Sequence, residues 1–244
     1  MKRIDAATMN SRRLNDAIHE ALDAGAKALA LDNVNGHRYI CAGVKGEVRV
    51  EIAGIPGNDL GAFMDGPRIE VKDNGQDAIA NTMNRGRIAV HGHAGDVLAY
   101  AMRGGELLVR DSVGYRVGIH MKAFRDLVPL IMIGGTARDF LGEYMAGGII
   151  IVLALCGDGP PAGYGVGSGA HGGAIYVRGR LKPEQLGKEV KPVPLDEVDR
   201  ALLARHVTDF CRTFGIGKPE KILRSRFSKY APVSHRPYGK LYAY

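Results

Sequence analysis

The 244-residue chain contains no tryptophan, and phenylalanine and tyrosine together make up 7% of it. Aromatic side chains dominate the buried area of many cores, so this interior has to be built from small and branched residues. Cysteine is also scarce. Cys41, Cys156 and Cys211 stand far apart without a Cys-x-x-Cys pair, which argues against a disulfide framework and against an iron–sulfur site on this chain.

Long hydrophobic runs are absent as well. A membrane-spanning helix needs about 18 or more consecutive apolar residues, and the run from 147 to 155 is much shorter than that. The opening residues, Met1 to Asp5, are not followed by an apolar segment of the kind found in secretory leaders. We therefore expect a cytoplasmic protein in a reducing compartment.

Acidic residues are fewer than basic ones, 26 against 33, and the net charge of +7 favours an acidic partner surface or a nucleic acid. Against a nucleic acid, the basic residues do not cluster with aromatic ones in the central part of the chain. The densest cluster of cations runs from Lys218 to Lys240. A C-terminal tail that docks on a partner subunit explains this cluster equally well.

Glycine, in contrast, is abundant, with 34 residues, and much of it belongs to a cassette that recurs every 19 residues from Gly57 to Gly179. A fixed period of this size indicates a solenoid. Each cassette contains a small residue, a methionine three positions later and a branched pair of the form Ile-x-Val. The small column is Gly61, Ala80, Ala99, Gly118, Gly142 and Gly167, and the next is Met64, Met83, Met102, Met121, Met145 and Ala170.

The branched pairs predict short strands, because residues two apart on a strand point to the same face. The pairs are Val50/Ile52, Ile69/Val71, Ile88/Val90, Leu107/Val109, Ile131/Ile133, Ile150/Val152 and Ile175/Val177. Strands that stack in this way rise about 4.8 Å per coil, so about seven coils would form a rod of roughly 30 Å. The earliest coil is expected to place Ala42 in the small column.

The small column marks a corner where only a small side chain fits or where φ is positive. The methionines are interpreted as core filling, because this unbranched side chain suits irregular gaps. Asn58, Asp77, Asp96 and Asp139 precede the small column by three residues. They are expected to accept backbone N–H bonds in Asx turns. Calcium is the alternative, but its β-helix repeats need Asp every nine residues, and this pattern is missing.

Two helices are expected outside the repeat. Asn10 or Ser11 can cap a helix that runs to about Ala24 and covers the open end of the solenoid, and residues 28–41 contain two short strand candidates. After a proline-rich linker, a second helix is expected from Leu195 to Phe214, with an extended arm beyond Gly215. The expected organisation is a capping segment (1–27), the β-helix (28–181) and a linker, helix and arm (182–244).

Few residues suggest chemistry. His91 and His93 share a face, but a third metal ligand is not evident. Ser168 lacks the glycine spacing of a nucleophile elbow, and the alternating glycines 163–169 do not follow the strand–helix pattern of a phosphate loop. His120 and His171 are interpreted as hydrogen-bonded corner residues rather than bases. The sequence therefore assigns no catalytic, cofactor-binding or metal-ligating residue to this chain.

Three segments carry a resemblance to a known family: Gly142 to Gly148 (GEYMAGG), the alternating glycines 163–169, and His171 to Val177 (HGGAIYV). Together they are similar to the C-terminal GXGXG domain of the glutamate synthase large subunit. The same domain type resembles the C-type subunit of formylmethanofuran dehydrogenase and of the formyltransferase/hydrolase complex. The resemblance covers about residues 28–180 and implies a right-handed parallel β-helix.

The resemblance implies a non-catalytic structural subunit of a glutamate synthase-type oxidoreductase complex active in glutamate biosynthesis. It would brace a glutamine amidotransferase subunit and an FMN and iron–sulfur synthase subunit, and those cofactors would sit on the partner chains. The alternatives are the C-type subunit of a formylmethanofuran dehydrogenase or formyltransferase/hydrolase complex, and a free-standing β-helix enzyme acting on polysaccharide. Partner contacts are expected at the basic tail and at two inserts, of about five residues after Met121 and about six after Leu155.

Overall fold

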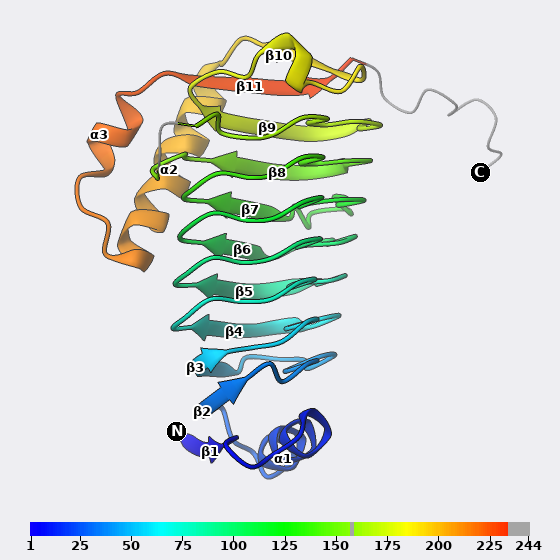
Figure 1. Cartoon of the computed structure of the whole chain (residues 1–244), viewed down its shortest axis with the longest axis vertical. Helices are drawn as coiled ribbons and strands as arrows, with labels where there is room; N and C mark the ends of the chain where they lie inside the picture. Colours follow the sequence, from blue (N-terminus) through cyan, green and yellow to red (C-terminus); the bar gives the residue numbers. More distant parts are fainter. Residues whose placement is uncertain (157–158, 234–244) are drawn as a thin grey trace, which may run out of the picture.

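The computed structural model describes residues 1–156 and 159–233, and it is a parallel β-helix (Figure 1). Nine strands follow one another along the rod, and each pairs in parallel with the next. They are β1 (Lys2–Asp5), β2 (Ala28–Asn35), β3 (Arg49–Ile55), β4 (Asp65–Val71), β5 (Arg85–Val90), β6 (Glu106–Val109), β7 (Leu130–Ile133), β8 (Ala146–Val152) and β9 (Gly172–Arg178).

The pairing confirms the branched columns residue by residue. Val50 pairs with Ile69, Ile69 with Ile88, and the same column continues to Ile175. These seven branched pairs are the strands β3 to β9, which enclose six complete turns. Stacking like residue on like residue satisfies the inner backbone groups and keeps one face of every strand buried.

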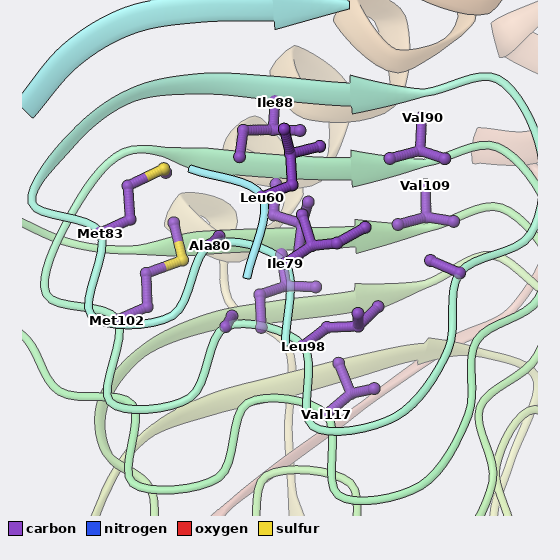
Figure 2. Packing of buried hydrophobic residues seen from close by; sticks show 14 of the residues in the cluster. Leu60, Ile79, Ala80, Met83, Ile88, Val90, Leu98, Met102, Val109 and Val117 are labelled. Atoms are coloured by element: carbon purple, nitrogen blue, oxygen red, sulfur yellow. The ribbon is translucent and has the colours of Figure 1, made fainter. Parts of the chain in front are cut away.

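The interior is a single column of buried aliphatic side chains and methionines (Figure 2). The methionine column is confirmed as core filling, because Met64, Met83, Met102, Met121 and Met145 are all at most 1% exposed. Four of these five side chains, all except Met102, also fill the space above a glycine of the next coil. A Cβ on Gly105, for example, would stand 2.5 Å from Met83 Cε. This contact explains why glycine follows the methionine in the cassette.

The first coil differs by one residue from the sequence-based expectation. Cys41, not Ala42, occupies the small column, because the Gly61 N–H donates to Ile40 O just as the Ala80 N–H donates to Leu60 O in the next coil. Cys41 is fully buried with a φ of 58°. The expectation of two strands between 28 and 41 is also wrong, because β2 is the one strand there and a turn follows it. β1 was not expected at all.

A helix covers the N-terminal end of the rod, as predicted. Asn10 caps helix α1 (Ser11–Asp23), and its Oδ1 accepts the Arg13 N–H at 3.0 Å. Its buried face contains Leu14, Ile18 and Ala21, which close the open end of the core. Figure 1 shows α1 and β1 below the first stacked coils, where an uncovered strand edge would otherwise face solvent.

The C-terminal region closes the other end. It contains a 3₁₀ turn, η1 (Pro183–Gln185), then β10 (Val190–Val193), α2 (Glu197–Phe214), α3 (Pro219–Leu223) and β11 (Phe227–Pro232). β11 lies antiparallel on β9 and β10 lies antiparallel on β11, so no edge of β9 is left open in the described structure. We expected an extended arm beyond Gly215, and the structure instead has α3 and β11 there. Residues 234–244 of this arm lie outside the described residues.

The predicted second helix is present, and it packs on the outside of the rod. Asp196 caps α2 by accepting the Asp199 N–H at 2.8 Å, and Gly215 ends the helix with a φ of 66°. The outward residues of the upper strands, such as Leu130, Met132 and Ile151, form a second core with Leu203, Val207 and Phe210 of α2. None of the described helices is long and apolar enough to cross a membrane.

Candidate functional site

Every coil turns the same corner through three alternating residues with positive φ, and this corner contains the Gly-x-Gly-x-Gly sequence of the last coil. There, Gly165, Gly167 and Gly169 have φ values of 70°, 69° and 69°. The equivalent residues of the earlier coils are Tyr39/Cys41/Gly43, Asp59/Gly61/Phe63, Ala78/Ala80/Thr82, Val97/Ala99/Ala101, Arg116/Gly118/His120 and Phe140/Gly142/Tyr144, all with positive φ. The glycine motif is therefore one version of a backbone conformation that every coil adopts.

The middle residue of each triplet faces the core, which explains the small column. A Cβ on Gly61 would stand 2.7 Å from Ile88 Cδ1, and a Cβ on Gly142 would stand 2.8 Å from Ile175 Cδ1. Ala80 and Ala99 are fully buried at the same position. Backbone hydrogen bonds alternate between the previous and the next coil along the triplet, as when the Val97 N–H donates to Tyr115 O and the Ala99 N–H donates to Ile79 O.

The last coil needs glycine for a further reason, because side chains cover its backbone. A Cβ on Gly165 would stand 2.7 Å from Phe140 Cδ1, and one on Gly167 would stand 2.6 Å from Val190 Cγ1. The glycines 163–169 lead into strand β9 rather than into a helix, so they do not form the helix N-terminus of a phosphate loop. Packing accounts for this glycine run.

The acidic column accepts backbone N–H groups, but not in the local turns that we expected. Asp77 Oδ1 accepts from the Asp96 N–H of the next coil at 2.9 Å, and Asp96 Oδ1 accepts from the Tyr115 N–H at 2.8 Å. Asp139 does the same for the Tyr164 N–H at 2.8 Å. The column is thus a ladder between coils. It also requires the neighbouring glycine, since a Cβ on Gly95 would stand 2.0 Å from Asp77 Oδ1.

The predicted histidine pair does not converge. His93 belongs to a second ladder, in which its Nδ1 accepts the Ser112 N–H of the next coil at 3.2 Å. His91 Nε2 lies 2.8 Å from Glu70 Oε1, and its ring contacts Phe214 of α2 edge-on at 5.0 Å. In the part of the chain that the structure describes, no group of three or more His, Cys, Asp or Glu side chains could hold a metal ion.

The other candidates also lie at the corner. Ser168 is half-buried against Gly187, and the hydrogen bonds of the described residues include none from a histidine to its hydroxyl. His171 Nδ1 lies 3.5 Å from Gly169 O. The His120 ring stacks on Tyr144 at 5.2 Å and meets Tyr100 edge-on at 5.8 Å, so aromatic contacts hold it rather than the hydrogen bond that we expected.

Aromatic side chains gather on the outside of this corner, although the chain has few of them. We call this surface the aromatic corner and define it by the exposed residues Tyr39, Phe63, Tyr100, Tyr115, Tyr144 and Tyr164. Tyr164 is 61% exposed and Phe63 is 56% exposed. Exposed aromatic residues that come from the same turn of several coils are typical of protein–protein interfaces, where such side chains supply much of the binding energy.

Sequence reasoning missed the aromatic corner because its residues come from different columns and do not follow the 19-residue period. A signal was available, since tyrosine and phenylalanine recur within the short corner segment of most coils. The insert after Met121, where we expected partner contacts, adds exposed Phe124 and Val128. The second expected insert, after Leu155, includes residues 157–158, which lie outside the described residues.

The fold and this corner define a β-helix whose common feature along the rod is a turn with three alternating residues of positive φ, which reads Gly-x-Gly-x-Gly in the last coil. A family model described as the GXGXG motif matches residues 17–234, and the chain therefore belongs to the GXGXG motif family. An uncharacterized protein of Methanocaldococcus jannaschii is 50% identical over 248 residues, covering 98% of this chain and 95% of the relative.

A solved structure has a similar fold. It is a chain of the formyltransferase/hydrolase complex (FhcABCD) from Methylorubrum extorquens in complex with methylofuran. The TM-score is 0.65 at 17% sequence identity, and the match covers 93% of this chain and 89% of the other. The similarity confirms the fold over nearly the whole chain, and that neighbour is part of an assembly of several different chains.

Proposed function

We propose that this chain is a non-catalytic scaffold subunit of a glutamine-dependent, glutamate synthase-like complex. In this complex it braces a glutamine amidotransferase subunit and an FMN and iron–sulfur synthase subunit, which are separate chains. The observation that carries the proposal is the aromatic corner, because it presents exposed tyrosine and phenylalanine side chains along the turn that defines the family. Such residues anchor subunit interfaces.

The character of the other conspicuous residues supports a scaffold rather than an enzyme. The glycines, methionines and aspartates of the repeat each have a packing or hydrogen-bonding role between coils. The histidines make ladder, aromatic or ion-pair contacts that also belong to the architecture. The flavin and the iron–sulfur cluster are accordingly assigned to the partner chains. The purified chain alone should lack visible absorbance, and the complex should have it.

A second candidate is the equivalent subunit of a formyltransferase/hydrolase or formylmethanofuran dehydrogenase complex. The specific observation in its favour is the similarity in fold to a chain of the formyltransferase/hydrolase complex, with a TM-score of 0.65. Both candidates assign the same bracing role to the β-helix and differ in the partners and in the chemistry of the complex.

Affinity purification at native expression level, followed by mass spectrometry, tests the proposal and separates the two candidates. Recovery of an amidotransferase and a flavoprotein in amounts equal to this chain supports the glutamate synthase-like complex. Recovery of formyl-transfer subunits would instead support the second candidate. The variant Phe63→Ala/Tyr115→Ala/Tyr164→Ala should retain roughly one tenth of the partners or less, given hot-spot costs of about 1–2 kcal/mol per residue. Val198→Ala, at an exposed site on α2, is the control.

A further inference from the structure

A second surface, on the opposite side of the wall from the core, is hollowed and strongly basic. It is a groove of about 1930 Å³ between the outer face of strands β3 to β5 and the C-terminal half of α2. We call it the arginine groove and define it by the exposed cations Lys27, Lys45, Arg49, Arg68, Arg85 and Arg205. The sequence did not indicate this groove, because Arg205 belongs to a helix that lies far from β3 and β4 along the chain.

The groove exists because α2 covers only part of the outer wall. From β6 upward the outward residues are apolar and pack under α2, as Leu108 and Met132 do. In β3 and β4 the column of Leu108 continues as Glu51 and Glu70. The neighbouring column of Leu130 continues as Arg49 and Arg68, so the outer face there is charged and the wall is open. Figure 1 shows α2 and α3 beside the upper coils, while the outer side of β3 and β4 has no helix against it.

Three arginines stack in this open wall. Arg49 pairs with Arg68, and Arg68 pairs with Arg87, on neighbouring parallel strands about 4.8 Å apart. Like charges directly opposite each other on a sheet repel, so this arrangement costs stability. Arg87 is neutralised by Glu106 at 3.1 Å and by Asp209 of α2 at 2.8 Å.

The remaining two arginines lack such compensation. Among the ion pairs of the described residues, neither Arg49 nor Arg68 has a carboxylate within 4.0 Å, and the same holds for Lys27, Lys45 and Arg205. In all, eight Lys or Arg residues and four Asp or Glu residues line the groove. The excess of positive charge therefore faces solvent in a concave surface, where it is suited to an anionic ligand.

Charge also narrows the choice of occupant. The residues 234–244 contain no Asp or Glu, so the end of this chain does not complement the groove. A second copy carries the same net charge of +7 and is disfavoured for the same reason. Guanidinium groups stacked at strand spacing match a row of carboxylates, because arginine binds a carboxylate through two parallel hydrogen bonds.

We propose that the arginine groove docks an acidic segment of a partner subunit, with several Asp or Glu side chains paired to Arg49, Arg68 and Lys45. The proposal rests on the proposed function, since it takes the chain to be one subunit of a complex. It adds a second contact, which depends on charge, to the aromatic corner, which depends on apolar burial. The complex should therefore loosen in high salt, with the loss arising at the groove.

The test compares two variants that each remove three positive charges. The groove variant is Lys45→Gln/Arg49→Gln/Arg68→Gln, and the control is Arg180→Gln/Lys188→Gln/Lys191→Gln, at exposed sites outside the groove. All six side chains are exposed, so the control should keep the thermal midpoint of the wild type. The groove variant should unfold at the same temperature or slightly higher, because it removes the repulsion among the stacked arginines. Partner recovery is measured after native affinity purification, and so is the affinity for a fluorescein-labelled ten-residue polyglutamate peptide.

The groove variant should recover roughly one tenth of the partner that the control recovers, and it should bind the peptide about tenfold more weakly, as expected for three lost ion pairs. Equal recovery with both variants would overturn the docking proposal and leave the proposed function standing. Recovery of no partner even by the wild type would overturn the proposed function instead. A third outcome would also overturn the docking proposal. In it, the wild type binds single-stranded DNA more tightly than the peptide at equal charge, and the groove variant recovers as much partner as the control.

Discussion

The Tyr144 ring lies against the backbone of Gly169 in the next coil, so closely that a Cβ on Gly169 would stand 2.3 Å from Tyr144 Cδ1. Gly169 also has a φ of 69°, a conformation that costs other residues energy. An aromatic side chain from the preceding coil thus leaves no room for any residue but glycine at the final position of the family motif. The same ring stacks on His120 one coil further down.

Gly169→Ala should therefore lower the free energy of unfolding by roughly 2–4 kcal/mol, from left-handed strain and overlap with the ring together. Denaturant unfolding followed by circular dichroism measures this change. Gly217→Ala is the matched control, because nothing lies within 4 Å of a Cβ there and φ is not positive. Equal stability of the two variants would show that the contact between Tyr144 and Gly169 does not restrict residue 169.

The aspartate ladder predicts a coupling between residues of adjacent coils. Asp77→Ala removes the acceptor of the Asp96 N–H and should cost about 1 kcal/mol. Gly95→Ala should cost more, because its methyl group meets Asp77 Oδ1 at 2.0 Å. In the double variant the overlap is relieved, so the combined loss should be smaller than the sum of the single losses. Strict additivity in a double-mutant cycle would contradict the ladder.

The buried Asp199 carboxylate predicts a pH-dependent contribution to stability. It accepts hydrogen bonds from Tyr176 Oη at 2.6 Å and from Lys229 Nζ at 2.8 Å. Burial alone would raise the pKa of Asp199, but these donors and the backbone outweigh it and lower the pKa. A carboxylate with a lowered pKa stabilises the fold above its unfolded pKa of about 3.9, and this stabilisation is lost as the pH falls further.

Asp199→Asn should accordingly lower the free energy of unfolding by about 3 kcal/mol at neutral pH, as expected when one partner of a buried ion pair is removed. The difference from the wild type should shrink below about pH 4, where the wild-type carboxylate takes up a proton. Unfolding curves over a pH series check this, with Asp23→Asn at an exposed site as the control. A difference that is independent of pH would contradict the charged state of Asp199.

The three cysteines should differ in reactivity. Burial raises the pKa of the Cys41 thiol to about 12, and burial also raises the pKa of Cys211, whereas Cys156 is exposed. The thiolate is the reactive form. At pH 8 a thiol reagent should therefore modify Cys156 quickly in the folded protein, and it should modify all three cysteines in denaturant. Rapid modification of Cys41 would show that the first coil is open, contrary to its place in the core.

The repeat could be predicted from the sequence because its signal is periodic. Like residues stack on like residues, so the columns of Ile150 or Met102 identify strands and core together. Cys41 was misplaced because the first coil contains one more residue between the small column and the strand. β1 was missed because four residues with a single buried side chain carry no alternation.

The two candidate surfaces could not be predicted in the same way. The aromatic corner depends on which side chains of each turn point outward, and the sequence does not show the alternating positive φ angles that shape this turn. The arginine groove depends on where α2 ends along the rod, and the contact of Asp209 with Arg87 spans more than one hundred residues of sequence. Such contacts are set by tertiary packing rather than by local pattern.

The native mass of the particle that contains this chain tests the central claim most directly. The chain alone has a mass of 26.2 kDa. In a gentle extract at native expression level, detected by antibody after size-exclusion chromatography, it should elute in a much larger heteromeric particle together with an amidotransferase and a flavoprotein. Elution at the mass of the free chain, or of an assembly of this chain alone, would contradict its role as a bracing subunit.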